Sequence, residues 1–551
     1  MVTHNSKYSS TRYHDPREQE FFSFEEVVLK GLASDGGLFH PHQVPNVRSR
    51  YVEWKDLTFP ELAFQVMRLY IDKDEISDED LNSIVVRSYS TFTHPDVVPL
   101  VPLDGPKKLY LLELFHGPTF AFKDVALQFL GNLFEFFLVR KNRPLGPGRA
   151  RHHLTVIGAT SGDTGSAAIY GLRGKKDVSI FIMFPDGKVS PVQEAQMTTV
   201  LDPNVHCLSV QGTFDDCQDY VKALFADPET NKIHHLGAVN SINWARILAQ
   251  ITYYFYAYFQ LLRQNAELKE VKFAIPTGNF GNILAGYYAK RMGLPVAKLV
   301  IATNENDILH RFWQTGSYSK TQQPGQEHGG GAEADGAEAH TDGVKETLSP
   351  AMDILVSSNF ERLLWHLSLE HELEQNPHVT VEISVRNAGK KIARWFQELK
   401  TTGTFTVDCE IVDKAREIFG TYRVSNEQTV ETIRECYRGS AISRKGYVLD
   451  PHSAIGVAAS LREIEASGPT RTVPMVSLAT AHPAKFANAV ELALKDEDGF
   501  DFNTILPEPF VGLGDKERKV LKVASTEGLV GIRNIITREV EKEKEATQNG
   551  A

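Results

Sequence analysis

Short apolar runs alternate with helical stretches between residues 100 and 302, and this alternation limits the folds open to the chain. Apolar runs typical of strands lie at residues 109–114, 154–157, 178–184, 205–210, 271–276 and 299–302, with helical stretches such as 216–225 and 283–291 between them. Strands and helices in alternation are joined by crossover connections into parallel sheets. Another run at 473–479 returns to the pattern. The sequence therefore predicts an α/β protein.

The flanking parts of the 551-residue chain differ from this pattern. A chain of that length forms about two to four domains. Residues 1–100 predict a small, mostly helical unit, with helices at 24–29 and 59–67. Residues 316–346 include a run of glycines and almost no large apolar side chain, so we expect a disordered surface insertion there. Its histidines indicate a solvated loop rather than a metal site, and the residues from Asp515 onward predict a charged terminal helix.

Composition excludes several classes of protein. The chain carries 59 basic and 70 acidic residues, a formal charge of -11, which argues against a nucleic-acid binder. Its four cysteines form no Cys-x-x-Cys pair, so neither a zinc knuckle nor a disulfide framework is predicted. The polar first residues indicate no signal sequence, and the charged and polar flanks of the apolar stretch at 251–258 indicate a buried helix rather than a membrane span. These features are typical of a cytoplasmic enzyme.

One lysine, Lys123, lies in an apolar and aromatic segment, His-Gly-Pro-Thr-Phe-Ala-Phe-Lys-Asp at residues 116–124. Apolar residues continue at helical spacing through Leu138, so Lys123 is predicted to lie where a loop enters a buried helix. Desolvation lowers the pKa of a lysine, which suits an amine that forms a Schiff base. The alternative is a side chain whose stem rests on apolar surface while its ammonium group stays in water.

Two glycine-containing loops follow predicted strands. Thr-Ser-Gly-Asp-Thr-Gly-Ser at residues 160–166 places amides and hydroxyls at the start of a helix, which is typical of an anion site. The alternative is an ordinary helix cap. Thr-Gly-Asn-Phe-Gly-Asn at residues 277–282 lets the backbone curl around an anion. It has neither the Walker nor the dinucleotide pattern, so it favours a phosphate-ester cofactor that is not a nucleotide, with a plain glycine-rich turn as the alternative.

A third loop follows the predicted strand at residues 473–479. Thr480 ends this strand, at the edge where open parallel sheets gather ligands. His482 comes two residues later, and we expect a structural histidine there rather than a catalytic base.

Together the three loops resemble those of the pyridoxal-phosphate enzymes with the tryptophan-synthase β-subunit fold, and among these the long form of the threonine synthase family. The segments that carry the resemblance extend over nearly the whole chain, at residues 8–12, 31–38, 116–124, 158–166, 240–246, 276–282, 349–354 and 357–362. Asp163 stands where sulfhydrylases of this fold usually carry asparagine. The insertion at 316–346 is the clear departure from the family pattern.

The resemblance implies fold type II: an α/β protein with two open, mostly parallel sheet domains with flanking helices, plus a small, mostly helical N-terminal domain. The N-terminal domain would comprise residues 1–100. The large domain, which binds the cofactor, would comprise 101–150 and 241–551. The small domain with the substrate loop would comprise 151–240.

The resemblance also implies a role for each loop. Lys123 would hold pyridoxal 5'-phosphate covalently and act as the catalytic base, with Thr480 facing the pyridine nitrogen and Asp163 near the ring hydroxyl. The cofactor phosphate would lie on Gly278, Asn279, Phe280, Gly281 and Asn282. The substrate carboxylate would lie on Ser161, Gly162, Thr164 and Gly165, and the substrate phosphate on Arg246 and Lys188. No metal is expected.

An enzyme of this family converts O-phospho-L-homoserine and water into L-threonine and phosphate, by γ-elimination followed by β-addition. Two alternatives stay open: a phospho-lyase of the same fold that releases a keto acid, ammonia and phosphate, and a cofactor-binding regulator without catalysis. A third alternative, a nucleotide-binding enzyme, is weakened because the Walker and dinucleotide-binding motifs are missing. The expected partner is the small-molecule substrate, with no nucleic acid or membrane, and the sequence leaves monomer and homodimer open.

Overall fold

The larger of two parallel sheets has six strands. The computed structural model describes residues 7–146, 149–160, 162–321, 343–439, 446–468 and 473–549. The strand order is β13 (Phe419–Arg423), β10 (Val296–Thr303), β9 (Val271–Pro276), β14 (Met475–Ala479), β4 (Leu109–Glu113) and β3 (Leu100–Asp104). All neighbours are parallel except β3 with β4. The loops that follow β4, β9 and β14 therefore leave the sheet at the same edge.

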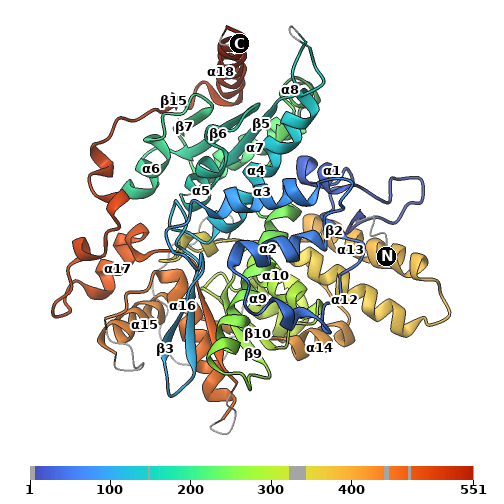
Figure 1. The fold of residues 1–551 in the computed structure, drawn as a ribbon, viewed down its shortest axis with the longest axis vertical. Coiled ribbons are helices and arrows are strands. Elements are labelled where there is room, and N and C mark those ends of the chain that lie inside the picture. The colour runs from blue at the N-terminus through green and yellow to red at the C-terminus, as the bar shows by residue number, and fades with distance from the viewer. Residues whose placement is uncertain are drawn as a thin grey trace.

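The second parallel sheet has five strands and lies above the first in Figure 1. Its order is β15 (Leu521–Val523), β7 (Val205–Val210), β6 (Val178–Pro185), β5 (Leu154–Ala159) and β8 (Leu236–Gly237), with every pair parallel. The central strands β5, β6 and β7 are almost entirely buried, which is why they read as continuous apolar runs. The predicted class, α/β with two mostly parallel sheets, is confirmed.

The C-terminal segment belongs to the five-stranded sheet, which differs from the domain boundaries expected from the sequence. Those boundaries placed residues 241–551 in the large domain. Instead, β15 pairs with β7, and the terminal helix α18 (Gly528–Asn549) packs Ile532 and Ile536 into the hydrophobic cluster of that sheet. In Figure 1 this red segment lies beside the green strands. A strand of three residues is too short for a periodic signal, so the sequence pattern missed it.

Helices cover both sheets. They are α4 (Lys123–Asn142), α5 (Asp163–Leu172), α6 (Pro191–Thr198), α7 (Phe214–Ala226), α8 (Pro228–His234), α9 (Trp244–Gln264), α10 (Gly281–Arg291), α11 (Ile308–Thr315), α12 (Phe360–Gln375), α13 (Val381–Thr402), α14 (Cys409–Ile418), α15 (Asn426–Arg438), α16 (Pro451–Ala466) and α17 (Ala487–Leu494). Short 3-10 turns lie at Pro350–Met352 and Pro483–Lys485, among others. Helices α5, α6 and α10 each connect two consecutive parallel strands of one sheet, as crossover connections require.

The N-terminal unit combines helices with a two-stranded sheet. Helices α1 (Phe24–Lys30), α2 (Phe59–Arg68) and α3 (Asp78–Tyr89) begin at Ser or Thr caps, which satisfy the free amides of the first turn. Strands β1 (Tyr8–Ser10) and β2 (Phe39–Pro41) pair antiparallel. This unit packs on α9 and α4, and Tyr8 donates a hydrogen bond of 2.5 Å to the carbonyl of Tyr70.

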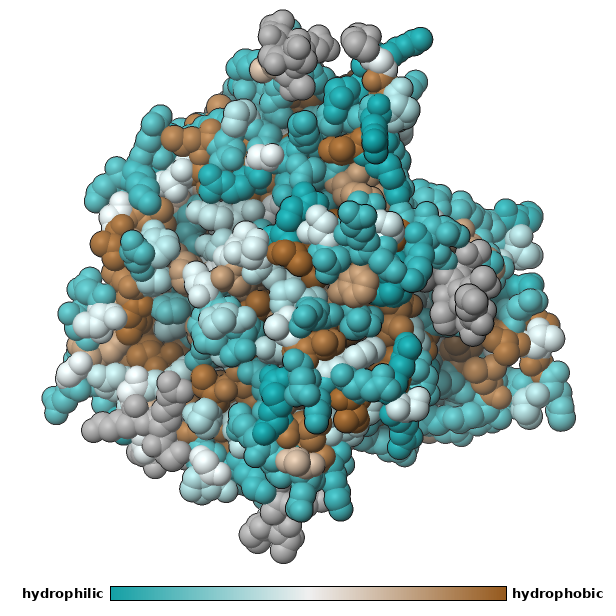
Figure 2. All heavy atoms as spheres, viewed as in Figure 1, coloured by the Kyte–Doolittle hydropathy of each residue, from teal (hydrophilic) through white to brown (hydrophobic). Residues whose placement is uncertain are grey.

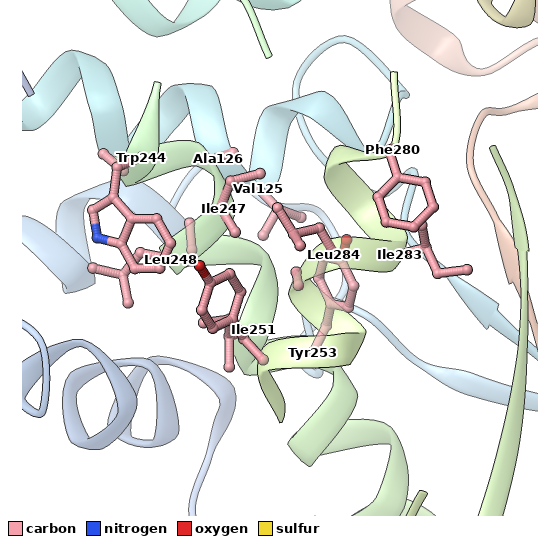
Figure 3. Packing of buried hydrophobic residues seen from close by; sticks show 14 of the residues in the cluster. Val125, Ala126, Trp244, Ile247, Leu248, Ile251, Tyr253, Phe280, Ile283 and Leu284 are labelled. Atoms are coloured by element: carbon pink, nitrogen blue, oxygen red, sulfur yellow. The ribbon is translucent and has the colours of Figure 1, made fainter. Parts of the chain in front are cut away.

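Helix α9 is the buried centre that joins the elements bearing the functional loops. It packs against α4 and α10, and Figure 3 shows Val125 of α4, Ile247 of α9 and Leu284 of α10 meeting in one apolar cluster. The apolar stretch at 251–258 lies within α9 and is fully packed in the core. No helix in the described ranges is long and apolar enough to cross a membrane. On the face in Figure 2, hydrophobic side chains are scattered among hydrophilic ones.

Only part of the expected insertion at 316–346 can be compared with the structure. Residues 322–342 lie outside the described residues. The first residues of the segment are ordered, because β11 (Ser317–Ser319) pairs antiparallel with β12 (Thr404–Thr406) and Tyr318 is buried against Phe360. The expected boundary at residue 316 is therefore too early, because one buried tyrosine anchors the chain in a segment with almost no large apolar side chain.

Candidate active site

The lysine loop and the loop after β14 are joined by backbone hydrogen bonds. The amide of Phe122 donates to the carbonyl of Thr480 (2.8 Å), and the amide of His482 donates to the carbonyl of Phe120 (3.0 Å). Ala121 and Ala481 form an antiparallel bridge between these bonds. Two segments far apart in the sequence therefore meet at the start of α4, with Lys123 as its first residue.

Asp124 holds the lysine loop in a folded conformation. Its carboxylate accepts hydrogen bonds from the amide (2.8 Å) and the hydroxyl (2.7 Å) of Thr119. A side chain at Gly117 would lie 2.5 Å from Cβ of Asp124, so only glycine allows this approach. Burial raises the pKa of Asp124 to about 6, although the bonds from Thr119 act in the opposite direction. Asp124 thus shapes the loop that presents Lys123.

Lys123 is buried, so its ammonium does not extend into bulk water. Its side chain is 10% exposed, and Nζ lies 3.7 Å from Oδ2 of Asp163 at the start of α5. Burial lowers the pKa of Lys123 below the ordinary lysine range, and the positive charges of Arg246 and Lys485 lower it further, whereas Asp163 opposes them. The alternative of a side chain with its head in water is wrong. The amine loses its proton more readily than a free lysine and can act as a nucleophile.

The loop at 277–282 lies between β9 and α10 and forms a cup of backbone amides. Phe280 adopts a left-handed conformation (φ 60°), which is uncommon for a residue with a side chain and tends to occur at functional sites. Within the described residues, the amides of Gly278, Asn279 and Phe280 donate to no other group. They lie at the N-terminal end of α10, where the helix dipole favours an anion.

A second set of residues fixes the shape of this cup. The hydroxyl of Ser357 donates to the carbonyl of Gly278 (2.7 Å), and Asn359 donates through its amide and side chain to the carbonyl of Asn279 (3.1 and 3.0 Å). Arg362 donates to the side chain of Asn359 and to the carbonyl of Phe39 in the N-terminal unit. The sequence contained these residues in a family-like segment but gave no sign of this role, because they act across the fold.

The glycine loop at 160–166 is tied together by one hydroxyl. Oγ1 of Thr160 accepts hydrogen bonds of 2.9 Å from the amides of both Gly162 and Gly165. These two amides therefore already have an acceptor, which differs from the expectation that they bind a substrate carboxylate. Thr164 is half-buried in the first turn of α5. Ser161, the remaining expected ligand, lies outside the described residues.

Asp163 lies between two buried lysines. Oδ1 is 3.0 Å from Nζ of Lys485, and Oδ2 faces Lys123. Burial alone would raise the pKa of Asp163, but the charges of Lys485 and Lys123 lower it to about 2. The carboxylate is thus an anion at any ordinary pH. Sequence reasoning missed Lys485, although its position five residues after Thr480, in the same loop, was the available signal.

Thr480 is held at the end of β14 by the start of α16. Its amide donates to the hydroxyl of Ser453 (3.0 Å), and this hydroxyl donates in turn to the carboxylate of Asp450. His482 packs edge-on against Phe115 and Phe120, and burial lowers its pKa to about 4. The imidazole is therefore neutral and serves packing, in agreement with the expectation of a structural histidine.

The two expected phosphate ligands lie in different surroundings. Arg246 is buried in the first turn of α9, where it donates to the carbonyl of Val239 (3.0 Å) and leaves Nε without a partner. Burial lowers its pKa to about 10, and its charge acts on Lys123. Lys188 is exposed in the turn after β6, and its charge acts on Asp216. Arg246 is thus a buried cation with unused hydrogen-bonding capacity beside the reactive amine.

These residues fit pyridoxal phosphate. A buried amine, a hydroxyl at the end of β14 and a cup of free amides converge where the strands of the large sheet end. Nδ2 of Asn282 is buried without a partner at the cup, while its Oδ1 accepts from Tyr253 (2.5 Å) and Tyr254 (2.9 Å). A buried donor without an acceptor is costly, so an anion at this position would satisfy it.

A parallel-sheet fold with a buried lysine and a phosphate cup of this kind defines a class of cofactor enzymes, and residues 92–357 match the family model described as pyridoxal-phosphate dependent enzyme. Two further family models match, threonine synthase N terminus at residues 7–89 and threonine synthase C-terminal at residues 453–536. The chain belongs to the threonine synthase family.

Known proteins agree with this assignment over the whole chain. Threonine synthase of Schizosaccharomyces pombe is 57% identical over 90% of this chain and 92% of that protein. Threonine synthase of Saccharomyces cerevisiae is 52% identical over 99% of this chain and 100% of that protein. The crystal structure of threonine synthase from yeast superimposes with a TM-score of 0.87 at 50% identity, covering 98% of this chain and 99% of that chain.

A structure of threonine synthase from Brucella melitensis with pyridoxal phosphate bound has a TM-score of 0.80 at 38% identity, and covers 97% of this chain and 99% of that chain. The resemblance seen in the sequence is therefore confirmed, as are the fold class and the cofactor. The chain is a pyridoxal-phosphate-dependent lyase.

Proposed function

We propose that this chain converts O-phospho-L-homoserine and water into L-threonine and phosphate. The observation that carries the proposal is the buried pair of Lys123 and Asp163, 3.7 Å apart, at the junction of three loops. A buried amine with a lowered pKa can attack a carbonyl group and exchange protons more readily than an ordinary lysine. The family assignment supplies the substrate class, because relatives that are 57% and 52% identical to this chain carry the name threonine synthase.

In this proposal, Lys123 moves the protons of the reaction. Pyridoxal phosphate, when bound, spreads the negative charge that develops when the carbon next to the amino group loses its proton. Lys123 would hold the cofactor until the amino group of the substrate takes its place, and the freed amine would accept protons from Cα and Cβ so that the phosphate can leave Cγ. The same amine would then return one proton to Cγ. Water would add at Cβ, and Lys123 would return the second proton to Cα. The ring of Phe122, whose centroid lies 5.9 Å from Nζ of Lys123, limits the access of other water molecules.

The remaining residues bind charges that do not react. The cofactor phosphate is assigned to the amide cup of residues 278–282, the pyridine nitrogen to Thr480, and the ring hydroxyl to the neighbourhood of Asp163. The substrate carboxylate is assigned to the loop at 161–165. Thr164 is the candidate donor there, because the amides of Gly162 and Gly165 already donate to Oγ1 of Thr160. Arg246 and Lys188 are the candidate cations for the substrate phosphate.

Product analysis tests the proposal against the phospho-lyase. With O-phospho-L-homoserine as substrate, we expect threonine and inorganic phosphate in equal amounts, measured by amino-acid chromatography and a phosphate assay. Ammonia and a keto acid in equal amounts, without threonine, would establish the lyase. Cofactor binding with no turnover of any kind would establish the regulator.

Arg246→Met is expected to raise the KM for O-phospho-L-homoserine at least about 10-fold, because a lost charge-assisted hydrogen bond costs about 1.5–3 kcal/mol. Arg246→Lys keeps the charge and should recover part of the loss. Lys188→Met should have a smaller effect, because water screens an exposed cation. Lys222→Met is the control, since Lys222 lies exposed on α7 and pairs with Asp219. A KM for Arg246→Met equal to that of the control contradicts this role.

We also assign the reaction to the cytoplasm. The structure places none of Cys207, Cys217, Cys409 and Cys436 in a disulfide, which fits a reducing compartment. A fluorescent fusion that accumulates in an oxidising compartment would contradict this location.

A further inference from the structure

Lys485 is a buried cation that shares the carboxylate of Asp163 with Lys123. It ends the short turn Pro483–Lys485, and its side chain is 0% exposed. Its ammonium donates to the carbonyl of Thr119 (2.7 Å) and to Oε1 of Gln196 (2.8 Å), and it lies 3.0 Å from Oδ1 of Asp163. Two hydrogen-bond acceptors and one ion-pair partner thus surround the ammonium group.

These three partners of Lys485 come from both halves of the molecule. Thr119 is part of the lysine loop, which follows β4 of the six-stranded sheet. Asp163 and Gln196 lie in α5 and α6, which connect strands of the five-stranded sheet. Gln196 also donates directly to the carbonyl of Thr119 (3.3 Å). One ammonium group therefore joins the two sheets directly beside Lys123.

The charges in this buried region explain why a second lysine is needed. An aspartate at position 163, facing only Lys123, would bind that amine as a full ion pair and keep it protonated. Lys485 shares the carboxylate and repels Lys123, so that the two effects on the amine oppose each other. An uncompensated buried carboxylate would also be costly. Aspartate here thus requires the second cation.

We propose that Lys485 is a positioning residue of the active site, which fixes Asp163 beside Lys123 and keeps the reactive amine from being held as a stable ion pair. The proposal rests on the role of Lys123 given above.

The charged groups around Lys123 set the expected direction of each change. The charges of Asp163, Arg246 and Lys485 act on the pKa of Lys123. Asp124 interacts in turn with Lys485 and Asp163, and His452 interacts with Asp163. Removing Lys485 leaves the attraction of Asp163, so the amine should keep its proton to higher pH. Removing the charge of Asp163 leaves the repulsion of Lys485, so the amine should lose its proton at lower pH. Removing both should return the amine close to its original behaviour.

The test measures the protonation of the Lys123 amine itself. The full-length chain, freed of cofactor and checked by circular dichroism, is labelled with a trace of acetic anhydride across a pH series. Mass spectrometry of the Lys123 peptide gives the pH midpoint of labelling. We expect Lys485→Met to raise this midpoint by about one unit, Asp163→Asn to lower it by about one unit, and the double variant to lie within about 0.3 units of the wild type.

Lys272→Met is the matched control. Lys272 is also buried and paired, with its ammonium 2.6 Å from Oε1 of Glu463 and 2.6 Å from Oγ of Ser467. It lies near the opposite end of β9 from the cup. This variant should lower the thermal unfolding temperature but leave the Lys123 midpoint unchanged.

Three results would overturn the proposal: an unchanged midpoint in Lys485→Met, a shift of equal size in Lys272→Met, or a double variant no closer to the wild type than the single ones. If Lys485→Met does not fold, the downward shift in Asp163→Asn and its reversal in the double variant still decide the matter. Labelling needs no turnover, so a chain that makes no threonine would refute the proposed function and leave this test valid.

Discussion

Lys123→Ala is expected to lower the rate of threonine formation at least about 1,000-fold, because it removes the group that holds the cofactor and transfers the protons. The fold should survive, because Asp163 keeps Lys485 at 3.0 Å as a counter-ion. Phosphate release and threonine formation should fall together, since both follow the same first proton transfer. The measurement is kcat from a phosphate assay, with cofactor content determined by absorbance.

Lys222→Ala is the control for this comparison, because it changes an exposed lysine on α7 and should retain full activity. Circular dichroism of Lys123→Ala should match that of the wild type. If Lys123→Ala turns over at more than about a tenth of the wild-type rate, Lys123 is not the catalytic base.

Gly131→Ala is expected to destabilise the protein by about 3 kcal/mol, the upper part of the usual range for overpacking. Gly131 lies on α4 where this helix crosses α5. An added Cβ would lie 1.9 Å from the carbonyl oxygen of Gly171, and a Cβ at Gly171 would lie 2.5 Å from that of Leu127. Both obstacles are backbone atoms, which cannot rotate away as a side chain can. The helices must therefore separate.

This separation should also affect the active site. Helix α4 begins at Lys123 and α5 begins at Asp163, so a shift between the helices changes the 3.7 Å distance between these side chains. We expect Gly131→Ala to lower both the thermal unfolding temperature and the catalytic rate. Gly105→Ala is the control, because no heavy atom lies within 4 Å of the added carbon. Equal unfolding temperatures for the two variants would show that the crossing tolerates a methyl group.

The strands were predictable because parallel sheets bury both faces of each strand. The apolar run at 205–210 coincides with β7, and that at 271–276 coincides with β9. Helix α9 was predictable because polar residues mark both ends of an unusually apolar stretch. The three-residue strand β15 and the first residues of the insertion, which hold Tyr318, were not predictable, because their burial depends on partners distant in the sequence.

The site was predictable where chemistry is local. A lysine among aromatic residues and a glycine loop before a helix carry their properties in consecutive residues. The use of the Gly162 and Gly165 amides by Thr160 was not visible, because a loop can satisfy its own donors or offer them to a ligand with the same sequence. The support of the cup by Asn359 and Arg362 was equally hidden, since it joins three distant segments.

The sequence by itself determined the alternation of strands and helices, the buried lysine at the start of a helix and the backbone cup for a phosphate group. These follow from periodicity, burial and backbone freedom, which neighbouring residues control. Only the tertiary structure decided which charges meet. Lys123, Asp163 and Lys485 come together because the loops after β4 and β14 of the six-stranded sheet meet the loop after β5 of the five-stranded sheet. The interaction of charges depends on distance in space and on exclusion of water, neither of which the order of residues records.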